Sequence, residues 1–267
     1  MKIALLQLTS GPDKGDNLAL LDAEIRRAAG QGARLIVAPE AASQGFNQGR
    51  LDTQAEDLGG PFSSGLRELA AELGVTIVAG MFRPADRLGG RNRVFNTALI
   101  TGGGVHKGYD KIHTFDVSSY RESDTVKPGG RLVTFLVDDL VVGVATCFDI
   151  RFPGQFTRLA MCGAGLVVVP TSWADGPGKL DQWRTLTQAR ALDAGVYIAG
   201  AGQARPGGAA LGGQASGPTG VGHSVVISPS GERIAEAGFE PTILYAEVDP
   251  GAIAEARARQ PLLHYPW

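Results

Sequence analysis

The chain has 267 residues, of which 43% are hydrophobic and 19% charged, so it can bury a large core and wholesale disorder is excluded. Its 25 Lys and Arg residues and 27 Asp and Glu residues give a net charge of −2, which provides no basic field for a nucleic acid partner. Two cysteines and four histidines, without a Cys-x-x-Cys spacing, exclude a disulfide framework and a cysteine-rich zinc site.

The amino terminus carries only a brief apolar run before Gln7, too short for the apolar region of a signal peptide. No apolar run elsewhere approaches the length of a membrane span. We therefore expect a cytoplasmic protein without membrane association. All-β and α/β folds of this size often form one unit, so residues 1–267 are expected to make a single domain.

Apolar runs of strand length, rich in β-branched residues, alternate along the chain with segments of helical spacing. The predicted strands cover residues 3–6, 35–38, 75–79, 98–100, 140–145, 166–169, 196–199 and 224–227. The predicted helices cover residues 17–29, 63–73, 155–162, 181–193 and 251–259. This alternation is typical of an α/β fold. Because residues 94–144 show no clear helix, paired or antiparallel strands are expected there, which favours a layered sandwich over a dinucleotide-binding fold.

Glycine is about twice as frequent as usual, with 38 residues, and seven of these lie in residues 205–222. A long loop inside a compact domain is often functional, and this one is expected to cover a site. The glycine-rich pieces match neither the dinucleotide fingerprint nor the phosphate-binding loop, so no nucleotide cofactor is expected.

Two predicted strands run directly into reactive side chains, Glu40 and Cys147. Ligands collect at the carboxyl ends of strands in α/β sheets, so these residues are expected to share a cleft. Pro153 suits the first turn of the following helix, and a thiol near a helix N-terminus can have a lowered pKa and act as a nucleophile. The competing interpretation of Cys147 is a small buried hydrophobe, and Cys162 is expected in the core.

Lys111 and Glu122 look, by themselves, like solvated charges on loops. His113 offers an alternative to a glutamate base, a Cys-His couple with Cys147. The residues around Cys147 do not resemble the local signatures of thiol proteases, which disfavours that couple.

Three segments in chain order resemble the signature regions of the nitrilase superfamily of carbon-nitrogen hydrolases. They are APE at 38–40, YDKIHTFD at 109–116 and TCFDIRFP at 146–153, and similar flanking segments extend the resemblance over nearly the whole chain. The resemblance implies a four-layer α-β-β-α sandwich that assembles as a homodimer or larger homo-oligomer. It also implies that no metal or organic cofactor is needed.

For mechanism, the resemblance implies a Glu-Lys-Cys triad that releases ammonia from an amide through a thioester. Glu40 corresponds to the general base and acid and Cys147 to the nucleophile. Lys111 corresponds to the cation that stabilises the oxyanion, together with the backbone N–H of Phe148. Glu122 looks like the additional glutamate that supports the site.

The run CFDIRFP is most similar to the branch that contains omega-amidase and deaminated glutathione amidase, whose substrates are small amides carrying a carboxylate. Arg151 and Arg184 are candidates to bind that carboxylate, and Phe148 and Trp173 to wall the pocket. Gly154, Arg184 and Ala194 stand where this branch usually has glutamate, glutamate and asparagine.

Other activities of the same chemistry remain open: a nitrilase, an N-carbamoyl amino acid hydrolase or an acyl transferase. A catalytically silent scaffold with the same fold is a further alternative. It is disfavoured because both glutamates, the lysine and the cysteine are all present.

Overall fold

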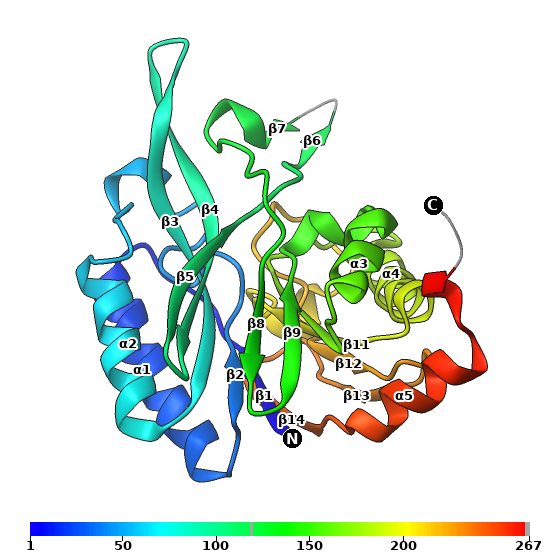
Figure 1. The fold of residues 1–267 in the computed structure, drawn as a ribbon. Coiled ribbons are helices and arrows are strands. Elements are labelled where there is room, and N and C mark those ends of the chain that lie inside the picture. The colour runs from blue at the N-terminus through cyan, green and yellow to red at the C-terminus, as the bar shows by residue number, and fades with distance from the viewer. Residues whose placement is uncertain (118–119, 265–267) are drawn as a thin grey trace.

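Two six-stranded sheets lie face to face in the computed structural model, which describes residues 1–117 and 120–264 (Figure 1). The first sheet has the order β14 (Thr242–Glu247), β1 (Lys2–Gln7), β2 (Leu35–Val37), β3 (Thr76–Leu88), β4 (Arg91–Gly102) and β5 (Val105–Asp110). The second has the order β13 (Arg233–Glu236), β12 (Val225–Ile227), β11 (Tyr197–Gly202), β10 (Leu166–Thr171), β9 (Leu140–Val144) and β8 (Thr134–Val137).

Each sheet has a parallel centre flanked by antiparallel strands. The strands β1, β2 and β3 are parallel in the first sheet, as are β9, β10 and β11 in the second. The last strand, β14, pairs antiparallel with the first, β1. A short antiparallel pair, β6 (Asp116–Val117) and β7 (Tyr120–Arg121), lies outside both sheets.

Helices cover the outer face of each sheet. In Figure 1, α1 (Lys14–Gly30) and α2 (Pro61–Leu73) lie on one side of the molecule, and α3 (Pro153–Met161) and α4 (Lys179–Ala194) on the other. A fifth helix, α5 (Pro250–Arg259), follows β14. The described residues also form short 3₁₀ helices: η1 (Leu51–Thr53), η2 (Glu122–Asp124), η3 (Cys147–Arg151), η4 (Gly208–Leu211) and η5 (Leu262–His264).

Alternation along the central strands divides the core into layers. In β1, Ile3 and Leu5 point between the two sheets, whereas Ala4 and Leu6 pack against the helices. The same period of two holds in β10, where Leu166 faces the other sheet. Each central strand is therefore buried on both faces, and the four-layer α-β-β-α sandwich expected from the resemblance is the observed fold.

All predicted strands and helices are present, and residues 94–144 form the expected antiparallel strands. The sequence did not predict the edge strands β5, β8, β13 and β14, which mix polar with apolar residues, or the short pair of β6 and β7. The expectation for Cys162 is wrong: it caps the exposed end of α3 and is itself exposed, because that helix buries its opposite face through Phe156 and Leu159. Within the described residues, no helix is long and apolar enough to cross a membrane.

Candidate active site

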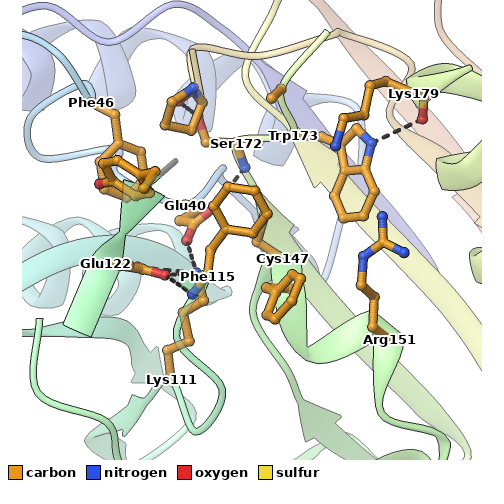
Figure 2. A pocket seen from close by; sticks show the side chains of 14 residues that line it. Glu40, Phe46, Lys111, Phe115, Glu122, Cys147, Arg151, Ser172, Trp173 and Lys179 are labelled. Carbon is orange, nitrogen blue, oxygen red and sulfur yellow. Dashed lines mark hydrogen bonds and ion pairs between the residues drawn. The ribbon is translucent and has the colours of Figure 1, made fainter. Parts of the chain in front are cut away.

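The ends of four strands, two from each sheet, bring reactive groups to one place. Glu40 follows β2 and Lys111 directly follows β5, both in the first sheet. Cys147 follows β9 and Ser172 directly follows β10, both in the second sheet. Glu122 opens η2. The site therefore straddles the boundary between the sheets, and Figure 2 shows the side chains of Glu40 and Glu122 reaching Lys111 beside Cys147.

Lys111 is the centre of a buried charge cluster. Its Nζ lies 3.0 Å from Glu40 Oε1, and 3.1 and 2.9 Å from the two carboxylate oxygens of Glu122. The exposed fractions are 1% for Glu40, 2% for Lys111 and 2% for Glu122. Glu122 also accepts a 2.6 Å hydrogen bond from the backbone N–H of Phe115. The prediction of solvated charges, made from Lys111 and Glu122 alone, is thus wrong, because the folded chain surrounds both.

Two residues that sequence reasoning missed hold the carboxylates in place. Asn96 Nδ2 donates to Glu40 Oε1 at 2.8 Å and to Glu122 Oε1 at 3.2 Å. The backbone N–H of Ser172 donates to Glu40 Oε2 at 2.8 Å. The polar side chain of Asn96 within the apolar run of β4 could have indicated a site residue in the sequence. The contribution of Ser172 comes from its backbone N–H, which the sequence does not reveal.

The backbone around the nucleophile candidate is held in an unusual conformation. Cys147 has φ +45°, in the left-handed region that non-glycine residues rarely occupy. The buried Asp149 fixes this turn, because its carboxylate accepts 2.8 Å bonds from the backbone N–H of Thr146 and from His113 Nδ1. The Asp149 carboxylate also accepts a 2.6 Å hydrogen bond from the hydroxyl of Tyr109. Such strain is concentrated at functional sites.

The close approach of β3 sets the position of Glu40. A Cβ on Gly80 would lie 2.5 Å from the backbone nitrogen of Ala41 and 2.7 Å from Glu40 Cα. Ala41 itself has φ +58°. Glycine at position 80 is therefore required for the base candidate to sit where it does.

The site's electrostatics keep the thiol neutral and the lysine charged. Burial raises the pKa of the Cys147 thiol, and the charge of Glu40 raises it further, against an opposing effect of Lys111. The prediction that a helix N-terminus lowers the pKa of Cys147 is therefore wrong. Burial by itself lowers the pKa of Lys111, but the charges of Glu122 and Glu40 outweigh it and raise that pKa well above its ordinary value. A base is thus needed to form the thiolate.

One pocket, part of it open to solvent, contains seven of the eight site residues predicted from the sequence. They are Glu40, Lys111, Glu122, Cys147, Phe148, Arg151 and Trp173. Aromatic rings form much of the remaining lining, including Phe46, Phe115 and Tyr120, and a mostly apolar lining with a few polar groups is typical of small-molecule sites.

Two cations stand at the pocket's rim. The Arg151 guanidinium lies 5.2 Å from the ring centre of Trp173, and Lys179 Nζ lies 5.9 Å from that of Phe115. Among the described residues, no carboxylate pairs with Arg151 or Lys179. The rim can therefore attract an anionic group on a ligand.

Arg184 and His113 do not join the pocket. Arg184 pairs with Glu236 at 2.8 Å, so the expectation that it binds a carboxylate of the substrate is wrong. His113 pairs with Asp149 and stacks on Phe152, which removes it as a partner for Cys147. In the described part of the chain, no group of three or more His, Cys, Asp or Glu side chains could hold a metal ion.

Comparison with known proteins gives consistent matches over almost the whole chain. The pattern of the family described as "Carbon-nitrogen hydrolase" matches residues 2–258. A protein of Mycobacterium tuberculosis named as a hydrolase is 44% identical, over 97% of this chain and 93% of its own length. The omega-amidase of Danio rerio is 33% identical, over 98% of this chain and 92% of its own.

A solved structure is similar in fold as well. It is a Saccharomyces cerevisiae member of branch 10 of the nitrilase superfamily, which matches with a TM-score of 0.81 and 30% identity. The match covers 98% of this chain and 94% of the yeast chain.

Proposed function

This chain belongs to the carbon-nitrogen hydrolase family of the nitrilase superfamily, and from that premise we propose that it is an amidase that releases ammonia from a small carboxylate-bearing amide. The observation that carries the proposal is the buried cluster of Glu40, Lys111 and Glu122, which lines one pocket with the thiol of Cys147. The naming of relatives as omega-amidases agrees with this substrate class.

Glu40 acts as the base. Because the pKa of the Cys147 thiol is raised, the thiol enters the reaction protonated and needs an acceptor for its proton. Transfer of that proton to Glu40 leaves the total charge of the buried cluster unchanged, which avoids the cost of adding a charge to a buried site. The Asn96 amide and the Ser172 N–H hold the carboxylate for this transfer.

Acylation then proceeds in two steps. The Cys147 thiolate attacks the amide carbon, and the negative charge that grows on the oxygen is stabilised by Lys111 Nζ and the backbone N–H of Phe148. Glu40 returns its proton to the leaving nitrogen, so ammonia departs and a thioester with Cys147 remains. Glu122 binds Lys111 through both carboxylate oxygens and keeps the ammonium turned toward the pocket.

Hydrolysis of the thioester uses the same base. Glu40 takes a proton from water, the hydroxide attacks the thioester carbon, and the proton passes to the departing Cys147 sulfur. The products are a carboxylic acid and the free thiol. No step requires a metal ion or an organic cofactor.

The rim cations set the substrate class. The Arg151 guanidinium lies over the rings of Trp173 and Phe148, with ring centres 5.2 and 5.8 Å from the guanidinium carbon. One of its NH2 groups donates to Gln182 Oε1 at 2.6 Å, and a guanidinium has further N–H groups with which to bind a carboxylate. Lys179 adds a second cation to the same rim.

An ammonia-release assay separates this proposal from its alternatives. The panel contains glutaramate, succinamate, a nitrile of the same length and an N-carbamoyl amino acid, with mass spectrometry of the protein to detect an acyl adduct on Cys147. Ammonia from glutaramate or succinamate, with an adduct that Cys147→Ala lacks, supports the amidase. Preference for the nitrile or the carbamoyl compound identifies one of the other activities, and transfer of the acyl group to added hydroxylamine in preference to water identifies an acyl transferase. No ammonia and no adduct with any compound identifies a silent scaffold.

The Glu40→Gln variant tests the base. It is expected to lower the rate of ammonia release by about 10²–10⁴-fold, the usual effect of removing a general base. A variant that keeps more than about a tenth of the original rate contradicts the role of Glu40.

Three further expectations belong to this proposal. The chain works as one catalytic domain over residues 1–267, it assembles as a homodimer or larger homo-oligomer, and it is located in the cytoplasm. Light scattering in solution measures the assembly, and fractionation of the source cells measures the location.

A further inference from the structure

A buried ion pair outside the catalytic cluster joins two loops at the mouth of the pocket. Arg205 Nε lies 2.8 Å from Asp175 Oδ2, and the two side chains are 6% and 1% exposed. Arg205 begins the glycine-rich loop 205–222, and Asp175 lies in the connection between β10 and α4 that also carries Ser172 and Trp173. Burying two charges is costly unless further hydrogen bonds satisfy both groups.

Nearly all of the further hydrogen bonds of Asp175 and Arg205 are made with the glycine-rich loop. Asp175 Oδ2 also accepts the backbone N–H of Gly213 at 2.9 Å. Arg205 donates to the backbone carbonyls of Leu211 and Gln214, both at 3.1 Å. Ser216 exchanges two 3.1 Å bonds with the backbone of Asp175, one through its N–H and one through its hydroxyl. Asp175 and Arg205 thus make many of the hydrogen bonds that hold this loop in its conformation.

The loop that is held in this way forms one wall of the pocket. Pro218 lines the pocket itself, and its carbonyl accepts the Ser172 hydroxyl at 2.6 Å. Residues 215–218 line the outer hollow together with Arg151 and Lys179. Since seven glycines leave the loop's backbone many conformations, a fixed wall depends on the bonds that pin it.

We infer that Asp175 and Arg205 are positioning residues whose ion pair fixes loop 205–222 as a wall that recognises the part of the substrate beyond the amide. This inference rests on the proposed amidase function. Apart from Pro218, the wall residues 215–217 line the outer hollow beside the rim cations, so they contact a substrate long enough to reach those cations rather than a short amide. Loss of the pair therefore weakens binding of long carboxylate-bearing amides and spares the chemistry at Cys147.

The main test variant is Asp175→Asn combined with Arg205→Gln, which removes both charges and leaves neither buried alone. The conservative variant Arg205→Lys keeps the ion pair but loses carbonyl contacts. The matched control is Arg257→Gln, because Arg257 also bonds two backbone carbonyls, those of Gly195 and Ala164, away from the pocket.

Two measurements are made on each protein. The first is kcat and KM for glutaramate and for propanamide, which lacks the carboxylate and the length. The second is hydrogen exchange of peptides covering residues 205–222, read by mass spectrometry, which needs no substrate.

For the double variant, the KM for glutaramate is expected to rise about tenfold, equivalent to about 1.4 kcal/mol, with kcat and the propanamide kinetics within about twofold. Exchange of residues 205–222 becomes faster. Arg205→Lys gives intermediate values, and Arg257→Gln changes neither measurement. Should the double variant fail to fold, Ser216→Ala removes one of the loop's bonds to Asp175 and is expected to give smaller changes in the same direction.

Unchanged exchange in the loop overturns the inference, as does an equal loss for both amides, since a merely structural pair affects both. If the original protein releases no ammonia from either amide, the proposed function has failed, whereas the exchange measurement still decides whether the pair holds the loop.

Discussion

Replacing Lys111 by methionine removes the cation that lies between the buried carboxylates of Glu40 and Glu122, while keeping a side chain of similar length. The ammonium makes three contacts of 2.9 to 3.1 Å with Glu40 and Glu122. Taking one partner from a buried charged cluster costs about 3–5 kcal/mol, because the remaining charges have neither water nor a counter-ion. At about 2 °C per kcal/mol for a chain of this length, the melting temperature falls by about 6–10 °C.

The same substitution removes the proposed oxyanion cation, for which a loss of about 10²–10³ in kcat is expected. A second variant separates the two effects. Lys111→Met combined with Glu122→Gln removes one of the two unpaired carboxylates, so it recovers much of the stability and none of the activity. Lys127→Met is the control, because its exposed pair with Asp86, at 3.2 Å, contributes at most about 1 kcal/mol.

Calorimetry gives the melting temperature and ammonia release gives kcat. Lys111→Met with a melting temperature within 2 °C of the original, by this scale about 1 kcal/mol, refutes the argument from buried charge. A folded variant that keeps more than about a tenth of the original kcat refutes the electrostatic role.

Three further predictions concern the same site. Cys147→Ala and Cys147→Gly are both expected to abolish ammonia release and to keep the fold. In urea unfolding, the glycine variant is expected to be the more stable by about 1 kcal/mol, because φ +45° at position 147 strains alanine. Equal stability of the two variants contradicts that strain. Gly80→Ala forces the backbone at Glu40 to move, so kcat is expected to fall about 10²-fold with the circular dichroism spectrum retained, and an unchanged kcat contradicts the close approach. Folding raises the pKa values of Cys147 and Lys111 above their ordinary values of 9.0 and 10.5. As the pH rises, the unfolded chain therefore loses these protons before the folded chain does, and the free energy of unfolding is expected to decline above about pH 9. The decline is expected to be less steep in Cys147→Ala.

The central strands and the position of Cys147 and Glu40 could be predicted from the sequence because both depend on local patterns. Apolar runs of four to six residues mark strands that are buried on both faces, and a reactive residue at the end of such a run lies at the sheet's carboxyl edge. The edge strands β13 and β14 were missed because one-sided burial leaves polar residues among their apolar ones.

The residues around Lys111 required more than local pattern. The burial of Lys111 depends on β5 pairing with β4 and on η2 folding over it, so only the resemblance to a known family drew attention to it. The choice between Arg151 and Arg184 depends on contacts far apart in sequence: Arg184 pairs with Glu236, 52 residues away. Such an ion pair cannot be inferred from the spacing of residues or from the composition of the chain.

Because the site is divided between the two sheets, enzymatic activity reports whether the two sheets have packed together. Glu40 and Lys111 come from one sheet and Cys147 from the other, so neither sheet alone contains both the proposed base and the proposed nucleophile. The first sheet also needs the last strand of the chain, since β14 pairs with β1. During refolding, secondary structure can therefore return before any turnover does, because turnover requires side chains from both sheets to be in place.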